Sequence, residues 1–349
     1  MRLSWNEVAA TRPSREGQAE EGAILLVVLW IALAMGLLGM SFSAAIRTEV
    51  NAARNVVDQK QSFYVARAGI EYAVYRIVEA RSAFSATQQQ SQGNLDQIPE
   101  VLTGHLTLTL HNGVARIEVA DESGKINLGA PVSQTQLDLI YNLLIMVGVD
   151  PSQADVITDS IVDWVDLDDF PSPNGAESDY YLSLETPYVA ANGPFQVPEQ
   201  LLLVRGVTPE IYYGKKGLSG SGEKVDYYGL QKYFTTFALG NRINANAAPL
   251  AVLAALPYLD EEMAGRIYDL REQGYIHDPS QLMQEIPGLT SNIATLLTAS
   301  PNTTIYGVTS VGQLEDSKVI SRIRCVIQLD PRSPKGYSVL YWNESNTEI

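Results

Sequence analysis

Cysteine and histidine are scarce in this chain of 349 residues, which contains only Cys325 and the scattered His105, His111 and His277. A single cysteine excludes an internal disulfide, and three separated histidines argue against a histidine-based zinc site. Basic residues are also outnumbered, because 24 Lys and Arg against 40 Asp and Glu give a formal net charge of -16. A chain this acidic repels nucleic acid and anionic lipid, and suits cations or basic partners instead.

Charge is absent altogether from the 20 residues between Ala23 and Phe42. This length is about what a helix needs to cross a bilayer, whereas the apolar region of a secretory signal has roughly 7–15 residues. A small-residue cleavage site, Ser43-Ala44-Ala45, does follow the run. The length therefore favours a permanent anchor, with a cleaved signal peptide as the alternative.

Helix-breaking residues are nearly absent from residues 46–80, which contain no proline and only one glycine, Gly69. Apolar side chains recur there close to helical spacing, at Ile46, Val50, Ala53, Val57, Tyr64, Ala68 and Tyr72. We therefore predict one helix over residues 23–81, apolar all round in its first half and amphipathic in its second. An ordinary anchor followed by a separate coiled segment is the alternative.

Strand patterns lie at both ends of the remaining chain. Residues 105–121 alternate between apolar and polar side chains around Asn112-Gly113, a hairpin turn signal. Residues 319–343 predict two more strands around a turn rich in proline and glycine, whereas residues 131–300 have mainly helical periodicity. These patterns predict an α+β fold in which a small antiparallel sheet, from residues 82–130 and 301–349, packs on the long helix. A large α-helical domain, residues 131–300, is inserted between the strands.

Lys and Arg are missing from Ile126 to Val204, although twelve Asp or Glu occur there. The densest part is residues 159–181, which contain Asp159, Asp163, Asp166, Asp168, Asp169, Glu177 and Asp179. A helix carrying Asp159 and Asp163 on one face must end before Pro171, and carboxylates at a helix C-terminus oppose the helix dipole. A hard divalent cation such as Ca²⁺ would compensate the repulsion, and a solvated acidic surface is the equal alternative. Phe170 and Pro171 stand where an EF-hand loop requires other residues, so this is not an EF-hand.

Two other segments, residues 198–212 and 243–289, resemble helix-hairpin-helix segments of the DNA-uptake type. Their turns are residues 204–207 and 286–289, and such turns bind phosphates through backbone N–H groups helped by basic neighbours. The turn at Gly288 follows Gln284 and Glu285 and precedes no Lys or Arg before Lys318, which is poor for phosphate binding. A membrane-anchored or secreted DNA-binding protein is therefore the alternative function, and we expect no nucleic acid partner.

Common catalytic motifs are absent: the chain has no Gly-x-Ser-x-Gly, no His-Glu-x-x-His and no P-loop. Cys325 lies in a predicted strand and is expected in the core. We expect a protein that is not an enzyme, with a hydrolase using the carboxylates of Asp166 and Glu177 as the alternative.

From Gly22 to Trp342 the chain resembles the minor pseudopilin K family of the type II secretion system, most specifically in the segments Gly22–Tyr72 and Asp163–Pro194. The resemblance implies a pilin-like fold with an inserted helix-hairpin-helix or SAM-like domain. It also implies a leader of residues 1–22 that a prepilin peptidase cuts between Gly22 and Ala23. Pseudopilins other than the K type carry a glutamate where this chain has Val27. The acidic pair Glu20 and Glu21 departs from the basic residues that usually flank the cut.

The resemblance also implies a function. It indicates a subunit at the tip of the pseudopilus that helps to initiate assembly and protein export across the outer membrane. The implied partners are the I- and J-type minor pseudopilins, the major pseudopilin and the prepilin peptidase. The chain would cross the bacterial inner membrane once, with its globular part in the periplasm. The similar acidic segment of the family implies structural calcium at Asp163, Asp166, Asp168, Asp169 and Glu177, with Asn192 and Asp179 in reserve and Trp164 in the core.

Overall fold

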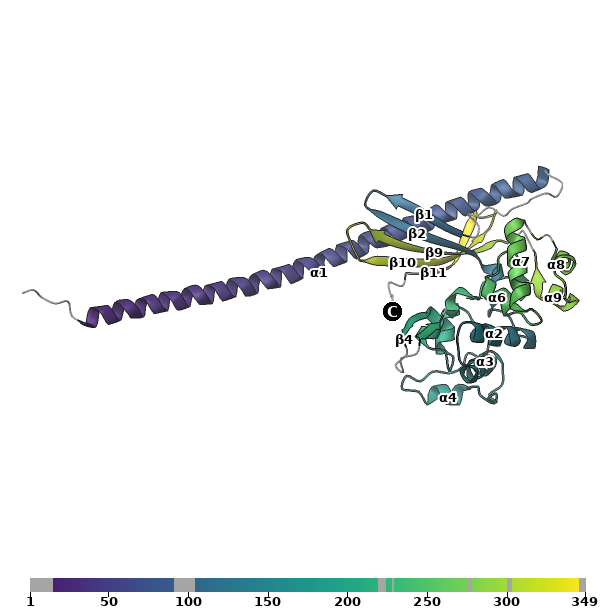
Figure 1. Ribbon diagram of the computed structural model, residues 1–349, viewed down its shortest axis with the longest axis horizontal. Helices are drawn as coiled ribbons and strands as arrows, with labels where there is room; N and C mark the ends of the chain where they lie inside the picture. The colour runs from purple at the N-terminus through teal and green to yellow at the C-terminus, as the bar shows by residue number, and fades with distance from the viewer. Residues whose placement is uncertain are drawn as a thin grey trace, which may run out of the picture. The chain divides into compact units, whose positions relative to one another are not determined.

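The computed structural model describes residues 15–90, 104–218, 224–227, 229–274, 276, 278–299 and 303–344 (Figure 1). Residues 1–14 of the predicted leader lie outside this part of the chain. The chain divides into two units, Met1–Gln61 and Ser62–Ile349, and each has its own organisation.

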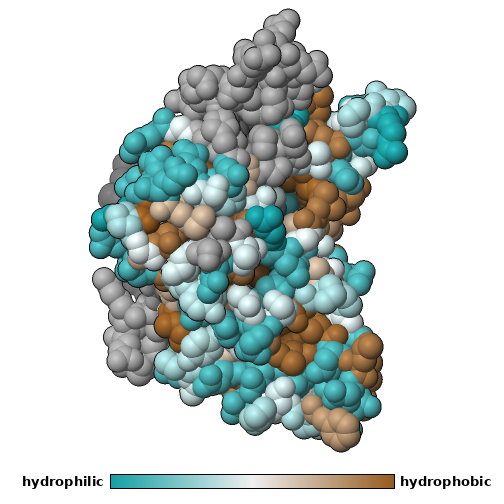
Figure 2. Space-filling model, turned by 90° about the vertical axis from the view of Figure 1, so that its right-hand side faces the viewer, coloured by the Kyte–Doolittle hydropathy of each residue, from teal (hydrophilic) through white to brown (hydrophobic). Residues whose placement is uncertain are grey.

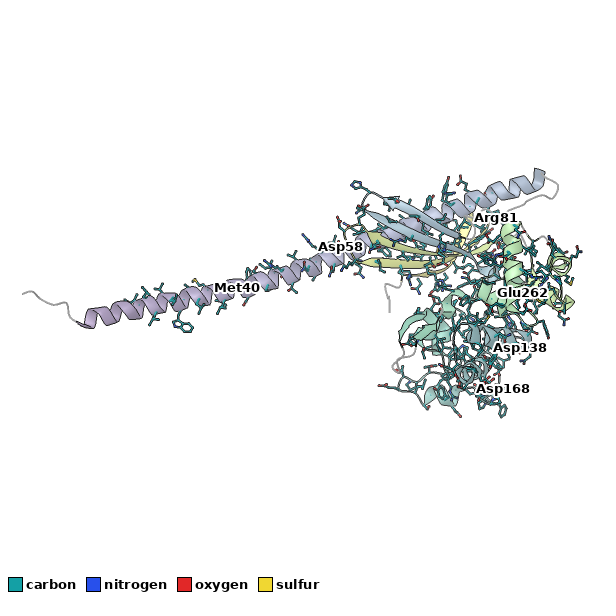
Figure 3. The ribbon with its side chains drawn as sticks, viewed as in Figure 1. Met40, Asp58, Arg81, Asp138, Asp168 and Glu262 are labelled. Carbon is teal, nitrogen blue, oxygen red and sulfur yellow. The ribbon has the colours of Figure 1, made fainter. Side chains whose placement is uncertain are left out.

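A helix of 76 residues, α1 (Arg15–Gln90), begins before and ends after the predicted range of 23–81. The extension at its C-terminal end follows from the absence of proline and glycine between residues 70 and 92. In the first unit every described side chain from Ile24 to Val57 is exposed, and Figure 3 shows side chains projecting from the helix around Met40. This stretch holds a window long and apolar enough to cross a membrane, with none of the window buried.

The second unit contains a five-stranded antiparallel sheet of order β1-β2-β9-β10-β11. Its strands are β1 (Gly104–Leu110), β2 (Gly113–Asp121), β9 (Ile305–Leu314), β10 (Ile320–Leu329) and β11 (Tyr337–Asn343). The predicted α+β class is confirmed, and β9 is a strand that the sequence patterns did not single out. The first hairpin turn is formed by His111 and Asn112, one residue earlier than predicted, because Gly113 already pairs with Leu110.

Residues 62–81 of α1 pack on the inner face of this sheet, and the contact uses small residues. A Cβ added at Gly69 would collide with the Ser310 hydroxyl and lie 2.8 Å from Ala115 Cβ. A Cβ added at Gly312 would collide with the helix backbone at Ser62 and Ala66. The close approach of helix and strand therefore requires glycine on both elements.

The buried stripe of α1 differs from the one predicted. Tyr64, part of the predicted stripe, is 63% exposed. The helix residues that face the core are Ser62, Val65, Ala66, Ile70, Ala73, Val74 and Ile77. Both sets have helical spacing, and the buried one is rotated around the same helix. Cys325 lies in this core, as expected from its strand, and burial raises the pKa of its thiol to about 12.

The segment between β2 and β9 forms the insert, which has its own hydrophobic core around Trp164, Tyr181, Phe195, Tyr212 and Phe234. Its α-helices are α2 (Gln134–Met146), α3 (Pro151–Val165), α4 (Ser178–Leu182), α5 (Pro209–Tyr213), α6 (Leu250–Ala254), α7 (Glu261–Gln273), α8 (Pro279–Glu285) and α9 (Ser291–Leu296). Short 3₁₀ helices are η2 (Glu122–Gly124), η3 (Pro198–Leu203) and η4 (Leu230–Lys232).

The insert also contains short strands, which the prediction of a helical domain left out. They pair as β3 (Ile126–Asn127) with β6 (Phe234–Thr235), β4 (Lys215–Leu218) with β5 (Lys224–Tyr227), and β7 (Ile243–Asn244) with β8 (Leu297–Thr298). Figure 2 shows one face on which hydrophilic residues predominate and hydrophobic residues form separate patches.

A polar network joins the insert to the sheet. Tyr341 on β11 donates a hydrogen bond of 2.7 Å to Glu199 on η3, and Arg324 on β10 lies 3.7 Å from the same carboxylate. Asn343 donates a further bond of 2.8 Å to the Tyr341 hydroxyl. Burial and the bond to Glu199 raise the pKa of Tyr341 to about 12. Because these groups are largely buried, the network fixes η3 against the sheet.

Candidate metal centre

Helix α3 positions the first acidic side chains. Asp150 caps its N-terminus by accepting a bond of 3.0 Å from the N–H of Ser152, and Pro151 occupies the first helical position. Asp163 lies in the last turn and is fully buried, and Asp166 is the C-terminal cap residue. The predicted arrangement, carboxylates at the C-terminal end of a helix, is therefore present.

The loop that follows α3 folds back onto the helix through two carboxylates. Asp159 Oδ2 accepts bonds of 2.9 Å and 3.0 Å from the backbone and side-chain nitrogens of Asn174. Both oxygens of Asp163 accept from the backbone N–H of Ser172, at 3.0 Å and 3.1 Å. The i, i+4 spacing of these two aspartates thus holds one loop at two points.

Gly175 lies where this loop passes closest to Asp163. A Cβ at that position would collide with Asp163 Oδ2 and lie 2.7 Å from its Cγ. The carbonyl of Gly175 accepts a bond of 2.8 Å from Arg205, whose guanidinium also lies 4.9 Å from the Tyr180 ring centroid. The loop therefore reaches Glu177 along a path that only glycine permits.

Three of the five predicted ligands meet at the end of this loop. One carboxylate oxygen from each of Asp163, Asp166 and Glu177 lies within 4.8 Å of the others. Asp166 Oδ1, both carboxylate oxygens of Glu177 and Asn192 Oδ1 are buried without a hydrogen-bond partner. Burial, helped by the charges of Asp163, Asp166 and Asp169, raises the pKa of Glu177 to about 7. Burial and the charges of Asp168 and Asp163 also raise the pKa of Asp166.

The other predicted ligands lie around this cluster rather than in it. Asp168 is exposed and accepts a hydrogen bond of 2.9 Å from the N–H of Phe170. It lies at the end of the insert away from the sheet (Figure 3). Asp169 is also exposed, 3.5 Å from the amide nitrogen of Asn192. Asp179 is exposed in the first turn of α4, the helix that Glu177 caps.

Trp164 is in the core as predicted, only 2% exposed. Its ring centroid lies 5.4 Å from that of Tyr181 and 6.2 Å from that of Phe195. This aromatic packing fixes the last turn of α3, and with it Asp163, the residue directly before Trp164.

The chemistry of the cluster fits a hard divalent cation. Buried carboxylates repel one another and carry a desolvation cost that pairing with a cation offsets. Among the described residues no ion pair reaches Asp163, Asp166 or Glu177. The oxygen atoms without partners are the ligand type that Ca²⁺ prefers, and Asn192 adds a neutral oxygen to the set.

Asn192 has a positive φ of 43°, and asparagine is one of the few residues that adopt this backbone region readily. The sequence identified it only as a reserve ligand. The roles of Gly175 and Arg205 were not foreseen, because their contacts join residues that lie far apart in the sequence.

The two hairpin turns of the DNA-binding alternative have glycine with positive φ, 88° at Gly206 and 90° at Gly288. Arg205 beside the first turn, however, is bonded to Gly175 of the acidic loop. A Cβ at Gly206 would lie 2.9 Å from Ile157, so this turn packs against α3.

A long apolar helix, an antiparallel sheet and an acidic insert define an α+β protein of pilin-like architecture. A protein-family model described as type II secretion system protein K matches residues 116–214, from β2 through the acidic loop to the end of α5.

Curated relatives carry the same description. A type II secretion system protein K of Pectobacterium carotovorum is 36% identical over 74 residues, 21% of this chain and 23% of that protein. A putative one of Escherichia coli is 26% identical over 204 residues, 55% and 60% of the two chains. That of Pseudomonas aeruginosa is 25% identical over 268 residues, 74% and 73% of the two chains. The aligned part thus spans about a quarter to three quarters of these relatives' lengths.

A solved structure shares the fold. One chain of the GspK–GspI–GspJ complex from the enterotoxigenic Escherichia coli type 2 secretion system matches with a TM-score of 0.57 and 16% identity. The match covers 84% of this chain and 99% of that chain. Together these comparisons confirm the resemblance to the type II secretion system protein K family.

Replacing Gly175 with alanine is expected to lower the free energy of unfolding by about 2 kcal/mol, because the new methyl group displaces the buried Asp163 carboxylate. The measurement is the thermal midpoint of the full chain. Gly193→Ala is the matched control, since its added Cβ would meet nothing closer than 3.7 Å. Equal midpoints for the two variants would show that the loop does not depend on this approach.

Proposed function

We propose that this chain is a minor pseudopilin of the type II secretion system, a structural subunit rather than a catalyst. The observation that carries the proposal is the family match over residues 116–214, which lies inside a fold similar to a chain of the GspK–GspI–GspJ complex. The subunit would sit at the tip of the pseudopilus and help to initiate its assembly and protein export across the outer membrane.

The N-terminal helix supports a membrane stage. Its exposed apolar stretch is long enough to cross the bacterial inner membrane once, with the globular unit in the periplasm. We propose that prepilin peptidase cuts between Gly22 and Ala23. Val27 then becomes the fifth residue of the mature helix, where an apolar side chain offers no charge to a neighbouring terminal amine. This fits a tip position with no subunit above it.

The proposed partners follow from the same similarity. The solved chain assembles, by the name of its complex, with GspI and GspJ. We infer that this chain binds the corresponding I- and J-type minor pseudopilins and then the major pseudopilin.

We also propose that the acidic cluster holds structural calcium. Asp163, Asp166 and Glu177 supply converging carboxylate oxygens, and Asn192 supplies a neutral one. Asp168 and Asp169 lie close enough to influence the pKa values of this cluster and are the further oxygen donors. Calcium would neutralise the repulsion and join the end of α3 to the start of α4.

Processing is the first test. Intact mass of the protein, purified from membranes of cells that contain the matching prepilin peptidase, is expected to begin at Ala23, and cells without the peptidase should yield the uncut chain. A mass beginning near Ala45 would instead indicate ordinary signal peptidase cleavage and contradict the pseudopilin assignment.

Assembly is the second test. The full chain, solubilised in detergent, is expected to co-elute with the I- and J-type pseudopilins of the same secretion system in size-exclusion chromatography. It should not retard a DNA duplex in a gel, because the chain carries a net charge of -16. Elution alone in the presence of both pseudopilins, together with a retarded duplex, would favour the DNA-binding alternative.

Calcium binding is the third test. Calcium at about 100 times its dissociation constant is expected to raise the thermal midpoint of the chain by about 5 °C, because it stabilises the folded state by about 2.7 kcal/mol. Glu177→Gln should abolish this rise, since it removes a carboxylate whose oxygens have no other partner.

The matched control for calcium is Asp155→Asn, which removes the same charge from an exposed position on α3. This variant should keep the full response. If both variants respond to calcium like the unchanged protein, Glu177 is not a ligand and the proposed centre is wrong.

A further inference from the structure

A basic groove lies on the outer face of the five-stranded sheet, although the chain as a whole is strongly acidic. Its volume is about 660 Å³. The walls come from the strands and from the insert, which contributes Lys125, Tyr213, Gln231 and Lys232. The cationic side chains that line it are Arg116, Lys125, Lys232, Arg322 and Arg324, and the carboxylate among the lining residues is that of Glu118.

The register of the sheet places two of these cations in one row across the strands. Arg116 on β2 and Arg322 on β10 both pair with Val311 on β9 and therefore lie on the same face of the sheet. One strand separates them, so their Cα atoms are about 10 Å apart. Both are exposed, and the shorter side chain of Val311 forms the floor between them.

The adjacent row carries opposite charges on its two sides. Arg324 and Glu118 both pair with Thr309, and His105 pairs with Glu118 on the edge strand. Short side chains thus form the floor of both rows. Arginines stand on both sides of the first row, whereas Arg324 stands opposite the carboxylate of Glu118 in the second. An extended chain could lie on such a floor with its own side chains reaching the arginines.

Some of the positive charge is already compensated. Lys125 forms a buried ion pair with Glu122, and Arg324 lies 3.7 Å from Glu199. Arg116 instead donates a bond of 3.2 Å to the neutral amide of Gln313, which leaves its charge uncompensated by that contact. Lys232 is exposed at the wall of the groove.

The size of the groove and the charge around it indicate the class of ligand. Carboxylates suit arginine because two parallel N–H groups can bind both oxygens. A nucleic acid longer than the groove would also meet the rest of a chain whose formal net charge is -16. A short acidic stretch of protein avoids that repulsion.

We propose that this groove binds an extended acidic segment of a partner protein, with its Asp or Glu carboxylates held by Arg116 on the sheet and Lys232 on the insert. The inference rests on the groove alone and does not require the pseudopilin assignment. Peptide binding tests it, whereas processing and co-elution test the assignment.

The experiment uses the full chain in a non-ionic detergent with EDTA, so that calcium cannot bridge two acidic groups. The probe is a fluorescein-labelled peptide, Gly-Asp-Glu-Asp-Glu-Gly, with the amide peptide Gly-Asn-Gln-Asn-Gln-Gly as its twin. Fluorescence anisotropy is expected to show binding of the acidic peptide that weakens with added salt, and about tenfold weaker binding of the amide twin.

Arg116→Gln is expected to weaken binding of the acidic peptide about tenfold, the effect of losing one charge-assisted contact, and Lys232→Gln to weaken it several-fold. Arg116→Lys should restore part of the loss. Arg332→Gln is the matched control, because it removes the same charge from a side chain that is 92% exposed in the turn before β11. Its affinity should stay within about twofold of the unchanged protein.

Four results would overturn the proposal. The acidic peptide could fail to bind at low salt, or the amide twin could bind equally well. Alternatively, Arg116→Gln and Arg332→Gln could weaken binding equally, which would show that the net charge of the protein alone attracts the peptide. A single-stranded oligodeoxynucleotide that binds more tightly than the peptide and is lost in Arg116→Gln would identify a nucleic-acid site instead. Thermal midpoints of the variants show that they are folded.

Discussion

The antiparallel pairing of β2 with β9 is the interaction on which the rest of the globular unit depends. The two strands are aligned from Gly113 with Leu314 to Asp121 with Tyr306, although residues 122–304 separate them in sequence. The entropy lost on closing so long a loop grows only with the logarithm of its length, so the pairing tolerates a large insert. The pairing does require the first and last residues of the insert to lie at the same end of the sheet. Two short parallel pairs hold distant parts of the insert together. The pair β3–β6 joins residues 126–127 to residues 234–235, and the pair β7–β8 joins residues 243–244 to residues 297–298.

The sheet so formed can receive the helix only because side chains are missing at the contact. Gly69 and Gly312 lie against the opposite element, and the Ser62 and Ser321 hydroxyls are 2.8 Å apart at the same interface. On the other face, Arg324 and Tyr341 hold Glu199 of the insert. The sheet thus separates an apolar, closely packed contact from a polar one. Charge that would be costly in the first can be retained in the second, because Tyr341 donates a hydrogen bond to the Glu199 carboxylate and the charge of Arg324 opposes it there.

Sequence patterns identified the elements better than the faces by which they meet. The α+β class, the long helix and the hairpin strands follow from local periodicity, which is why they were predictable. The buried stripe of α1 was wrong because both Tyr64 and Val65 belong to sets with helical spacing, and only the position of the sheet decides which set is buried. At the acidic loop, the family resemblance implied Asp163, Asp166 and Glu177, which converge, together with Asp168 and Asp169, which lie outside the cluster. The separation depends on Gly175 and Arg205, whose contacts connect residues 12 and 30 positions apart and leave no local pattern.

The net charge of the chain conceals two opposite surfaces, and their separation has a physical consequence. The acidic loop lies at the end of the insert away from the sheet, where Asp168 is labelled in Figure 3, while the arginines of β2 and β10 lie on the sheet itself. Exposed charges at such a separation are largely screened beyond about 8 Å at physiological ionic strength. Neither surface therefore neutralises the other within one molecule. A cation at the loop and a carboxylate in the groove would each act on its own surroundings, so that binding at one leaves the electrostatics of the other nearly unchanged. An acidic chain can in this way keep a local attraction for an acidic partner.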